Sequence, residues 1–238
     1  MVRKKNLHKK QPIEWRSHEP NRLETFSDAV FAFALTLIIV SIEVPKSFDD
    51  LYETMKGGVS FAACFAMLFL IWNSQNIFFR RYGLNDPLTV NLNGILLFVV
   101  LIYVYPMKFL SQLLFMGGHY VHEGKVMSMI TRTDQTRTLM LIYGIGYCVI
   151  YLLFFLMYMN AKRKEVHLEL TPKEAFETHT IAYINLFSVF IGMLAMALAI
   201  ILPDNICGIS GFTYFLIPIA YSVWFSYRGK KSRLAFAQ

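Results

Sequence analysis

The sequence has little charge, and negative charge is the scarcer kind. Its 238 residues include 16 Asp and Glu against 23 Lys and Arg, and charged residues make up only 16% of the chain. Hydrophobic residues make up 55%, and the mean hydropathy is +0.44. Because ordinary soluble domains carry more charge and less apolar surface, this composition indicates a membrane protein.

Signatures of catalysis and metal binding are also scarce. The three cysteines, Cys64, Cys148 and Cys207, lie in or beside apolar runs, and their number and spacing give neither a disulfide framework nor a metal-ligand set. All six histidines lie outside the apolar runs or at their ends, and the sequence contains no HExxH, GxSxG or paired acidic motif. We therefore expect no enzymatic activity, no cofactor and no metal site.

Six apolar runs are long enough to cross a bilayer as helices, which takes about 20 residues each. They cover residues 26–44, 57–79, 89–115, 137–160, 179–202 and 205–227. Membrane-spanning strands would alternate apolar and polar residues, and these runs do not. The sequence therefore predicts an all-α membrane protein with six transmembrane helices per subunit.

Most of the Lys and Arg residues fall on one side of such a six-helix arrangement. They occur in the first 22 residues, in the loops near 80 and 162–173, and after residue 227. The positive-inside rule makes this side, with both termini, cytoplasmic in the cell membrane. We divide the chain into a basic arm (1–21), a six-helix membrane domain (22–227) and a basic tail (228–238). Since this rule and anionic lipid explain the net charge of +7, no nucleic-acid partner is expected.

Two local signals concern the second half of the chain. Thr171, Pro172, Lys173 and Glu174 form a capping box with proline at the first helical position, which predicts that a helix begins there and runs into the fifth span. Pro218 predicts a kink in the sixth span.

The first apolar run has a carboxylate at each end, Asp28 and Glu43. A charge near the bilayer is costly and usually faces protein or water, so the pair suggests a path for cations. For Glu43, a merely interfacial position is an equal alternative.

One stripe of the same run contains Phe33, Thr36, Leu37 and Val40, which recur at helical spacing. A stripe of apolar residues on a spanning helix has no meaning by itself. The Thr36 hydroxyl has an ordinary alternative role, because a threonine in a helix commonly donates to the carbonyl four residues before it, here that of Ala32.

The segment that opens this run carries a more specific pattern, Arg22, Phe26, Ser27 and Asp28 in the arrangement RxxxFSD. Ser27 or Asp28 can cap the start of the helix, and Arg22 can pair with a carboxylate or a phosphate. The second and third runs offer polar partners, notably Trp72 and Asn93. We interpret this motif network as support for helix packing and not as a set of ion ligands.

The RxxxFSD motif resembles the signature of the transmembrane protein 175 family of potassium channels. The resemblance extends to the six-span layout and to Trp72, Asp86, Asn93 and Pro106, whereas the last two spans match only as apolar helices. It implies a homotetramer in which the first helix of each subunit lines a central pore.

Carried over by position, the resemblance implies a hydrophobic gate at Phe33, a hydroxyl layer for potassium preference at Thr36, and further lining by Leu37 and Val40. The sequence departs from the family pattern where Phe33 replaces a smaller Ile or Leu, so either Phe33 or Leu37 is the narrowest ring. Gln75 also stands where the family usually has His.

These observations lead to one functional hypothesis, a passive cation channel in the lipid bilayer that prefers potassium modestly over sodium. Potassium is then the permeant ion among monovalent cations, and Asp28 and Glu43 draw cations to the pore mouths. A proton-permeable leak channel is one alternative. A secondary transporter is another, although the chain lacks repeated halves with paired helix breaks.

Overall fold

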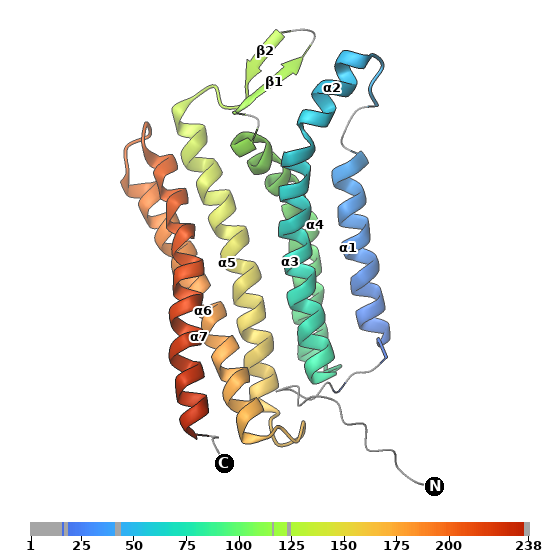
Figure 1. Cartoon of the computed structure of the whole chain (residues 1–238), viewed down its shortest axis with the longest axis vertical. Coiled ribbons are helices and arrows are strands. Elements are labelled where there is room, and N and C mark those ends of the chain that lie inside the picture. Colours follow the sequence, from blue (N-terminus) through green and yellow to red (C-terminus); the bar gives the residue numbers. More distant parts are fainter. Residues whose placement is uncertain (1–15, 17–18, 41–43, 116, 123–124, 236–238) are drawn as a thin grey trace.

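The computed structural model describes residues 16, 19–40, 44–115, 117–122 and 125–235 (Figure 1). Its elements follow in the order α1 (Arg22–Val40), α2 (Phe48–Lys56), α3 (Gly58–Tyr82), α4 (Pro87–Phe115), β1 (His119–His122), β2 (Lys125–Ser128), α5 (Thr133–Arg163), α6 (Pro172–Ile201), η1 (Cys207–Phe215) and α7 (Leu216–Ala235). The chain is therefore almost entirely helical, as the sequence predicted.

Within the described part of the chain, six helices are long and apolar enough to cross a membrane. They are α1, α3, α4, α5, α6 and the continuous pair η1–α7, and they match the six predicted runs. The helices lie side by side along the long axis of the molecule (Figure 1). The predicted six-span fold class is confirmed.

The helices pack in a definite order across the bundle. α1 contacts α3 and α4, α4 contacts α5, and α5 packs extensively on α6, which in turn contacts η1 and α7. The apolar core lies mainly between α1, α3, α4 and α5, around buried side chains such as Phe78, Leu96 and Met157. As a result α1 lies at one edge of the bundle and α7 at the opposite edge (Figure 1).

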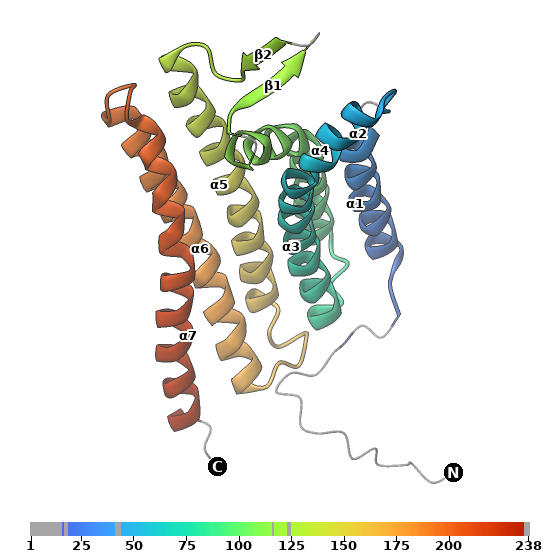
Figure 2. The same ribbon diagram turned by 45° about the horizontal axis from the view of Figure 1, so that its top comes forward.

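The two ends of the bundle differ in composition. We call the end at which α1 begins the basic end, because it carries Arg80, Arg81, Lys162, Lys164 and Arg228. The opposite end carries α2 and the hairpin of β1 and β2 (Figure 2), so we call it the hairpin end. The two strands pair antiparallel, with Val121 opposite Val126.

The sequence correctly predicted the start of α6. Thr171 is its N-cap, Pro172 lies in its first turn, and the Thr171 hydroxyl accepts a hydrogen bond from the Glu174 amide. The last span differs from the prediction, because its irregularity precedes Pro218. The span begins as a 3-10 helix and becomes α-helical at Leu216, so Pro218 lies in the first turn of α7, where a missing amide hydrogen is tolerated.

Candidate functional site

The α1 helix has one face packed against its own subunit. Phe31, Ala34 and Ile38 are buried there, at intervals of three and four residues that place them on one side of a helix. This face contacts α3 and α4. The packing fixes which side of α1 the subunit leaves uncovered.

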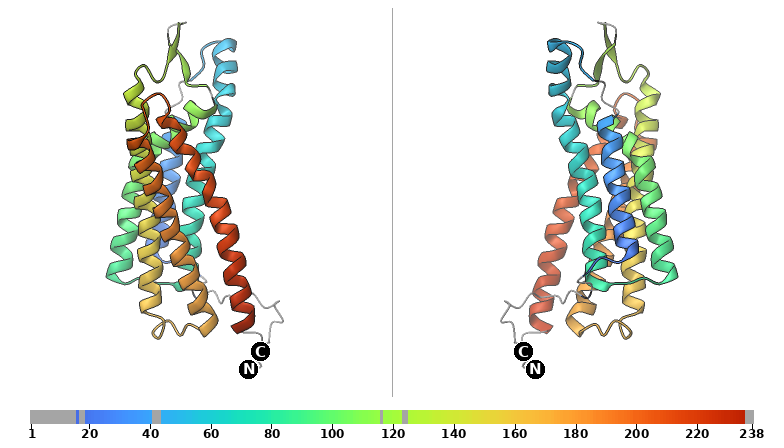
Figure 3. Two further views of the ribbon diagram at one scale, coloured as in Figure 1. Left: turned by 90° about the vertical axis from the view of Figure 1, so that its left-hand side faces the viewer. Right: turned by 90° about the vertical axis from the view of Figure 1, so that its right-hand side faces the viewer.

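The uncovered side of α1 includes a continuous stripe. We call it the exposed stripe, and it consists of Phe26, Ala29, Phe33, Thr36 and Val40, while Ala32 and Ile39 are exposed beside it. Phe33 is 57% exposed and Val40 is 73% exposed, although both are large apolar side chains. Leu37 lies at the border of the stripe, where it is half-buried against the core. Figure 3 shows α1 on the surface of the bundle, lying across α3 and α4.

Thr36 makes the local hydrogen bond that the sequence suggested as an alternative. Its hydroxyl donates to the carbonyl oxygen of Ala32 at 2.9 Å. Because a hydroxyl has one hydrogen and two acceptor lone pairs, the oxygen remains able to accept or to coordinate a cation. The local bond and an ion-facing role are therefore compatible.

The start of α1 differs from the expectation that Ser27 or Asp28 caps it. The helix begins at Arg22, and the Asn21 side chain accepts a hydrogen bond from the Glu24 amide at 2.8 Å. The Glu24 carboxylate accepts in return from the Asn21 amide at 3.3 Å. This reciprocal pair is a capping box, and it leaves Ser27 and Asp28 available for contacts with other helices.

Ser27 takes part in a buried chain of hydrogen bonds across three helices. Its hydroxyl accepts from Asn93 of α4 at 2.9 Å, and the Asn93 carbonyl accepts from the Gln75 amide of α3 at 3.0 Å. Ser27 and Asn93 are fully buried and Gln75 is 2% exposed. Hydrogen bonds between polar side chains hold spanning helices together, so this chain fixes α1 against its neighbours.

Asp28 makes a separate bond to α3. The indole nitrogen of Trp72 donates to the Asp28 carboxylate at 2.7 Å. A cleft of about 140 Å³ lies beside this pair at the basic end, and Glu19, Glu24 and Arg80 also contribute to its lining. The structure therefore places Asp28, which is bonded to Trp72, in a cleft that is also lined by two glutamates.

The remaining members of the expected site lie apart from these bonds. Arg22 and Phe26 are exposed at the start of α1, on the same side of the helix as Phe33. Glu43 lies outside the described residues, so its place at a pore mouth stays a prediction.

Asp86 connects α4 to α5 at the basic end. Its carboxylate accepts from the Thr89 hydroxyl at 2.7 Å and from the Asn160 amide at 3.1 Å, and it pairs with Lys164 at 3.1 Å. Partial burial alone would raise the pKa of Asp86, but the hydrogen bonds from Thr89, Lys164 and Asn160 outweigh it and lower the pKa to about 2. The carboxylate is therefore ionised at neutral pH and acts as an electrostatic link between the two helices.

Sequence reasoning missed two groups of residues around the start of α1. Asn21 and Glu24 were detectable, because an Asn followed three residues later by Glu before an apolar run is a capping signal. Arg16, which forms an ion pair with Glu174, gave no such signal, since its partner is 158 residues away in the sequence.

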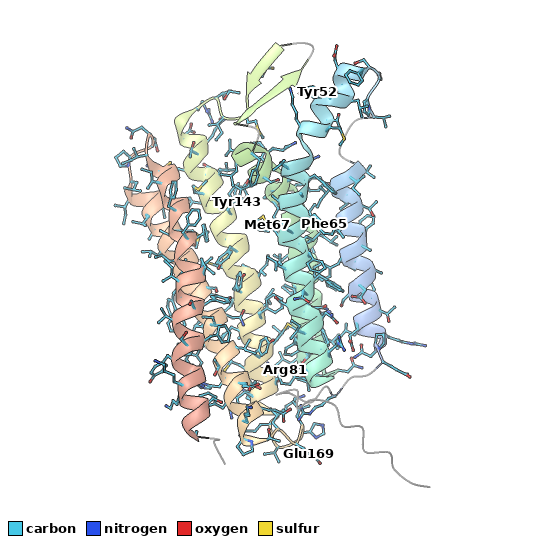
Figure 4. All side chains as sticks on the ribbon, viewed as in Figure 1. Tyr52, Phe65, Met67, Arg81, Tyr143 and Glu169 are labelled. Atoms are coloured by element: carbon cyan, nitrogen blue, oxygen red, sulfur yellow. The ribbon has the colours of Figure 1, made fainter. Side chains whose placement is uncertain are left out.

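Figure 4 labels Arg81 and Glu169 at the basic end, the region to which Arg16 connects. Arg81 donates to Glu177 of α6 at 3.0 Å, and the Tyr82 and Thr178 hydroxyls lie 2.8 Å apart. Polar contacts between the ends of α3 and α6 therefore cluster at this end of the bundle.

Comparisons with known proteins show which sequences and solved structures this chain is similar to. A sequence model described as endosomal/lysosomal potassium channel TMEM175 matches residues 22–106, which contain α1, α3 and most of α4. The chain is 38% identical over 231 residues to a protein of Marivirga tractuosa named potassium channel, covering 93% of this chain and 92% of that one.

Solved structures show the same arrangement of helices. A crystal structure of the potassium channel MtTMEM175, a threonine-to-alanine variant bound to a nanobody–MBP fusion, matches with a TM-score of 0.78 and 35% identity over 92% of this chain and 97% of that one. A crystal structure of a TMEM175 homologue from Chamaesiphon minutus, described as a lysosomal potassium-selective channel, matches with a TM-score of 0.55. That match covers 89% of this chain and 96% of the other at 22% identity, so it supports the fold alone.

Proposed function

The chain belongs to the TMEM175 family of potassium channels, and we propose that it conducts potassium passively through a pore lined by α1 in a homotetramer. It is a channel and not an enzyme. The observation that carries the pore assignment is the exposed stripe of α1, because it places the hydroxyl of Thr36 between large apolar side chains on the side of the helix that its own subunit leaves uncovered, while the opposite side packs into the core.

In this proposal the exposed stripes of the four subunits face one another across a central axis. The stripe holds the three positions that a cation pore needs: a bulky apolar ring, a hydroxyl ring next to it, and a wider apolar lining. These are Phe33, Thr36 and Val40, which lie at successive turns of α1. Leu37 completes the lining from the border of the stripe.

We assign the narrowest ring to Phe33. Its side chain is exposed on the stripe, whereas Leu37 is half-buried against its own subunit and reaches the axis less fully. A ring of apolar side chains interrupts the water column of a pore, and a hydrated ion cannot pass until the ring widens. Phe33 is then the gate.

We assign the potassium preference to Thr36. The hydroxyl hydrogen is used in the bond to the Ala32 carbonyl, so the oxygen presents lone pairs to the axis. Four such oxygens replace part of the hydration shell of a passing cation and favour the ion that gives up its water more easily. Since the sequence has no TVGYG-like loop, one hydroxyl ring supports only a modest preference for potassium over sodium.

Acidic groups at the two ends of α1 suit a cation path. Asp28 lies at the cleft beside the basic end, and Glu43 follows α1 in the sequence. Carboxylates at a pore mouth raise the local concentration of cations. By the positive-inside rule the basic end faces the cytoplasm, so we propose that both termini lie on the cytoplasmic side of the cell membrane.

Recordings from the purified protein in a planar bilayer test this proposal. With potassium on one side and sodium on the other, we expect a passive current whose reversal potential shows a preference for potassium. A flux that saturates and depends on a counter-ion gradient would instead identify a transporter, and equal permeation by protons would identify a proton leak.

A further inference from the structure

An arginine ahead of the first helix connects α1 to the far side of the subunit. Arg16 lies six residues before the start of α1, yet its side chain reaches the beginning of α6. One guanidinium nitrogen donates to Glu174 Oε1 at 3.1 Å, and the other donates to Oε2 at 3.0 Å. This is the bidentate geometry in which an arginine–carboxylate pair is strongest.

Arg16 makes further contacts through its side chain and its own backbone amide. Its Nε donates to the Leu168 carbonyl at 2.9 Å, in the loop between α5 and α6, and its own amide donates to the Arg80 carbonyl at 3.1 Å, near the end of α3. The side chains of Arg16 and Glu174 are only 21% and 7% exposed. A pair this shielded is weakly screened by salt, unlike ion pairs at an open surface.

Glu174 is itself held in place by the start of α6. Its carboxylate accepts from the Thr171 amide at 2.9 Å and from the Thr171 hydroxyl at 3.1 Å. The carboxylate that receives Arg16 is therefore held by its own helix end as well as by the arginine. Arg16 is joined to α1 through only five intervening residues, so the ion pair limits how far the start of α1 can move from α6.

The position of this pair matters because α1 packs on one part of the subunit and Glu174 belongs to another. α1 contacts α3 and α4, and its buried hydrogen bonds go to the same two helices. Arg16 thus connects the segment leading into α1 with the α5–α6 part of the subunit.

We propose that Arg16 is a positioning residue for the pore: its ion pair with Glu174 anchors the basic end of α1 to α6 and sets how readily the gate opens. This inference rests on the proposed function, since it assumes that α1 lines the pore. Arg16 acts through α1 and does not contact the permeating ion.

The test uses the full chain in lipid, with one double variant and two single ones. Arg16→Gln combined with Glu174→Gln removes both charges, so no buried charge is left without a partner, and the introduced glutamine on α6 keeps an oxygen for the Thr171 cap. Arg16→Lys keeps the positive charge but loses the two parallel N–H donors with which the guanidinium binds both oxygens of Glu174. Arg132→Gln is the matched control, because Arg132 pairs with Asp134 at 3.3 Å in an exposed position at the other end of the bundle.

Hydrogen exchange measured by mass spectrometry gives a readout that does not depend on conduction. In the double variant we expect the amides of residues 21–30 to exchange on the order of tenfold faster, with Arg16→Lys intermediate and Arg132→Gln unchanged. Faster exchange only in residues 164–172 would mean that Arg16 merely holds the α5–α6 loop, and it would overturn the inference.

Single-channel recording gives the second readout. We expect the mean closed time in the double variant to shorten about tenfold, the change in opening rate that about 1.4 kcal/mol produces, with unitary conductance and ion preference unchanged. Faster exchange in residues 21–30 with unchanged gating would overturn the positioning role. If the unmodified protein carries no potassium current, the proposed function itself fails and the gating role with it, while the exchange result still decides whether Arg16 anchors α1.

Discussion

At the scale of single residues, Thr36 shows how one hydroxyl can satisfy its helix and still serve an ion. Its hydrogen bonds to Ala32, and its side chain lies on the exposed stripe. Thr36→Ala removes the oxygen without removing any partner that another helix needs. The fold should therefore be unaffected, and any change in permeation reports directly on the oxygen ring.

We expect Thr36→Ala to weaken the preference for potassium over sodium. If the four hydroxyls together favour potassium by about 1 kcal/mol, the permeability ratio should fall about fivefold. The ratio is measured from reversal potentials under bi-ionic conditions. Thr138→Ala is a suitable control, because the Thr138 hydroxyl makes the same kind of bond to Asp134 on the exposed surface of α5. An unchanged ratio in Thr36→Ala would remove Thr36 from the selectivity layer.

Phe33 is a bulky apolar side chain on the exposed stripe, and as the proposed gate it should limit current. We expect Phe33→Ala to raise unitary conductance severalfold, because the apolar ring widens and stays wet. Phe98→Ala provides the comparison, since Phe98 is 63% exposed on α4 and lies outside the exposed stripe. If only Leu37→Ala increased the current, the narrowest ring would lie one turn nearer the hairpin end.

The stability contributed by Asp86 should depend on pH, because its pKa is lowered to about 2 in the folded protein from an ordinary value of 3.8. A lowered pKa stabilises the fold at pH values above the ordinary pKa, and this stabilisation is lost as the pH falls towards about 2. Asp86→Asn keeps an oxygen for Thr89 but loses the charge, so at pH 7 it should lower the free energy of unfolding by about 2 kcal/mol.

Thermal unfolding in detergent measures this effect. The difference in melting temperature between the unmodified protein and Asp86→Asn should be constant from about pH 7 to 5 and should shrink below about pH 4. Asp49→Asn is the control, because Asp49 is exposed on α2. A difference that stayed the same down to about pH 3 would show that the charge of Asp86 is not its source.

At the scale of elements, α1 is held by polar bonds to α3 and α4 as well as by packing. Asn93 is the central residue, since it donates to Ser27 and accepts from Gln75. Asn93→Ala leaves the buried Gln75 amide without its acceptor, so we expect a loss of about 1 to 2 kcal/mol in the free energy of unfolding.

In a background with Trp15 and Trp224 replaced by Phe, Trp72 fluorescence during unfolding can follow this loss, because the indole bonds to Asp28 of α1. Asn91→Ala is the matched control on the same helix, where Asn91 is exposed. Equal stability of the two variants would show that the buried chain of hydrogen bonds contributes nothing to holding α1.

The elements also show why some features were predictable from the sequence. Length and hydropathy predicted all six spans, and the capping box of Thr171 and Glu174 predicted the start of α6, because both are local properties. The cap of α1 was predicted at the wrong residues, because Ser27 and Asp28 are typical capping residues in the RxxxFSD motif, whereas the actual cap, Asn21, precedes the motif. The polar α2 helix and the hairpin lie outside any apolar run, so hydropathy gave no sign of either.

The candidate site was predictable only in part for a similar reason. Helical spacing grouped Phe33, Thr36 and Val40, but it also included Leu37, and only tertiary packing distinguishes the half-buried Leu37 from the others. The hydrogen-bond partners of Ser27 and Asp28 lie 66 and 44 residues away in the sequence. At such a separation the sequence shows which polar residues could be partners, but not which two residues bond to each other. The resemblance to a family identified the candidate site residues, and the structure shows which of them form hydrogen bonds with each other.

At the scale of the whole molecule, the position of α1 at the edge of the bundle has a consequence for assembly. A lone subunit leaves Phe33, Thr36 and Val40 on its surface. Copies of the chain arranged around a common axis bring these residues together and bury the exposed stripe. We therefore expect a particle in mild detergent with a mass four times the 27.6 kDa of one chain.

Cross-linking distinguishes an axial α1 from a peripheral one. In a background with Cys148 replaced by Ser, a short thiol-reactive cross-linker should join Val40→Cys subunits into dimers, because residues that face one central axis lie closer together than residues on the outer surface. Ile102→Cys, on an α4 side chain that is 57% exposed, should remain monomeric if it faces lipid. Dimers from Ile102→Cys but not from Val40→Cys would place α4 at the subunit contact and α1 outside it. The exposed stripe would then face lipid, and the pore would have to be lined by another helix.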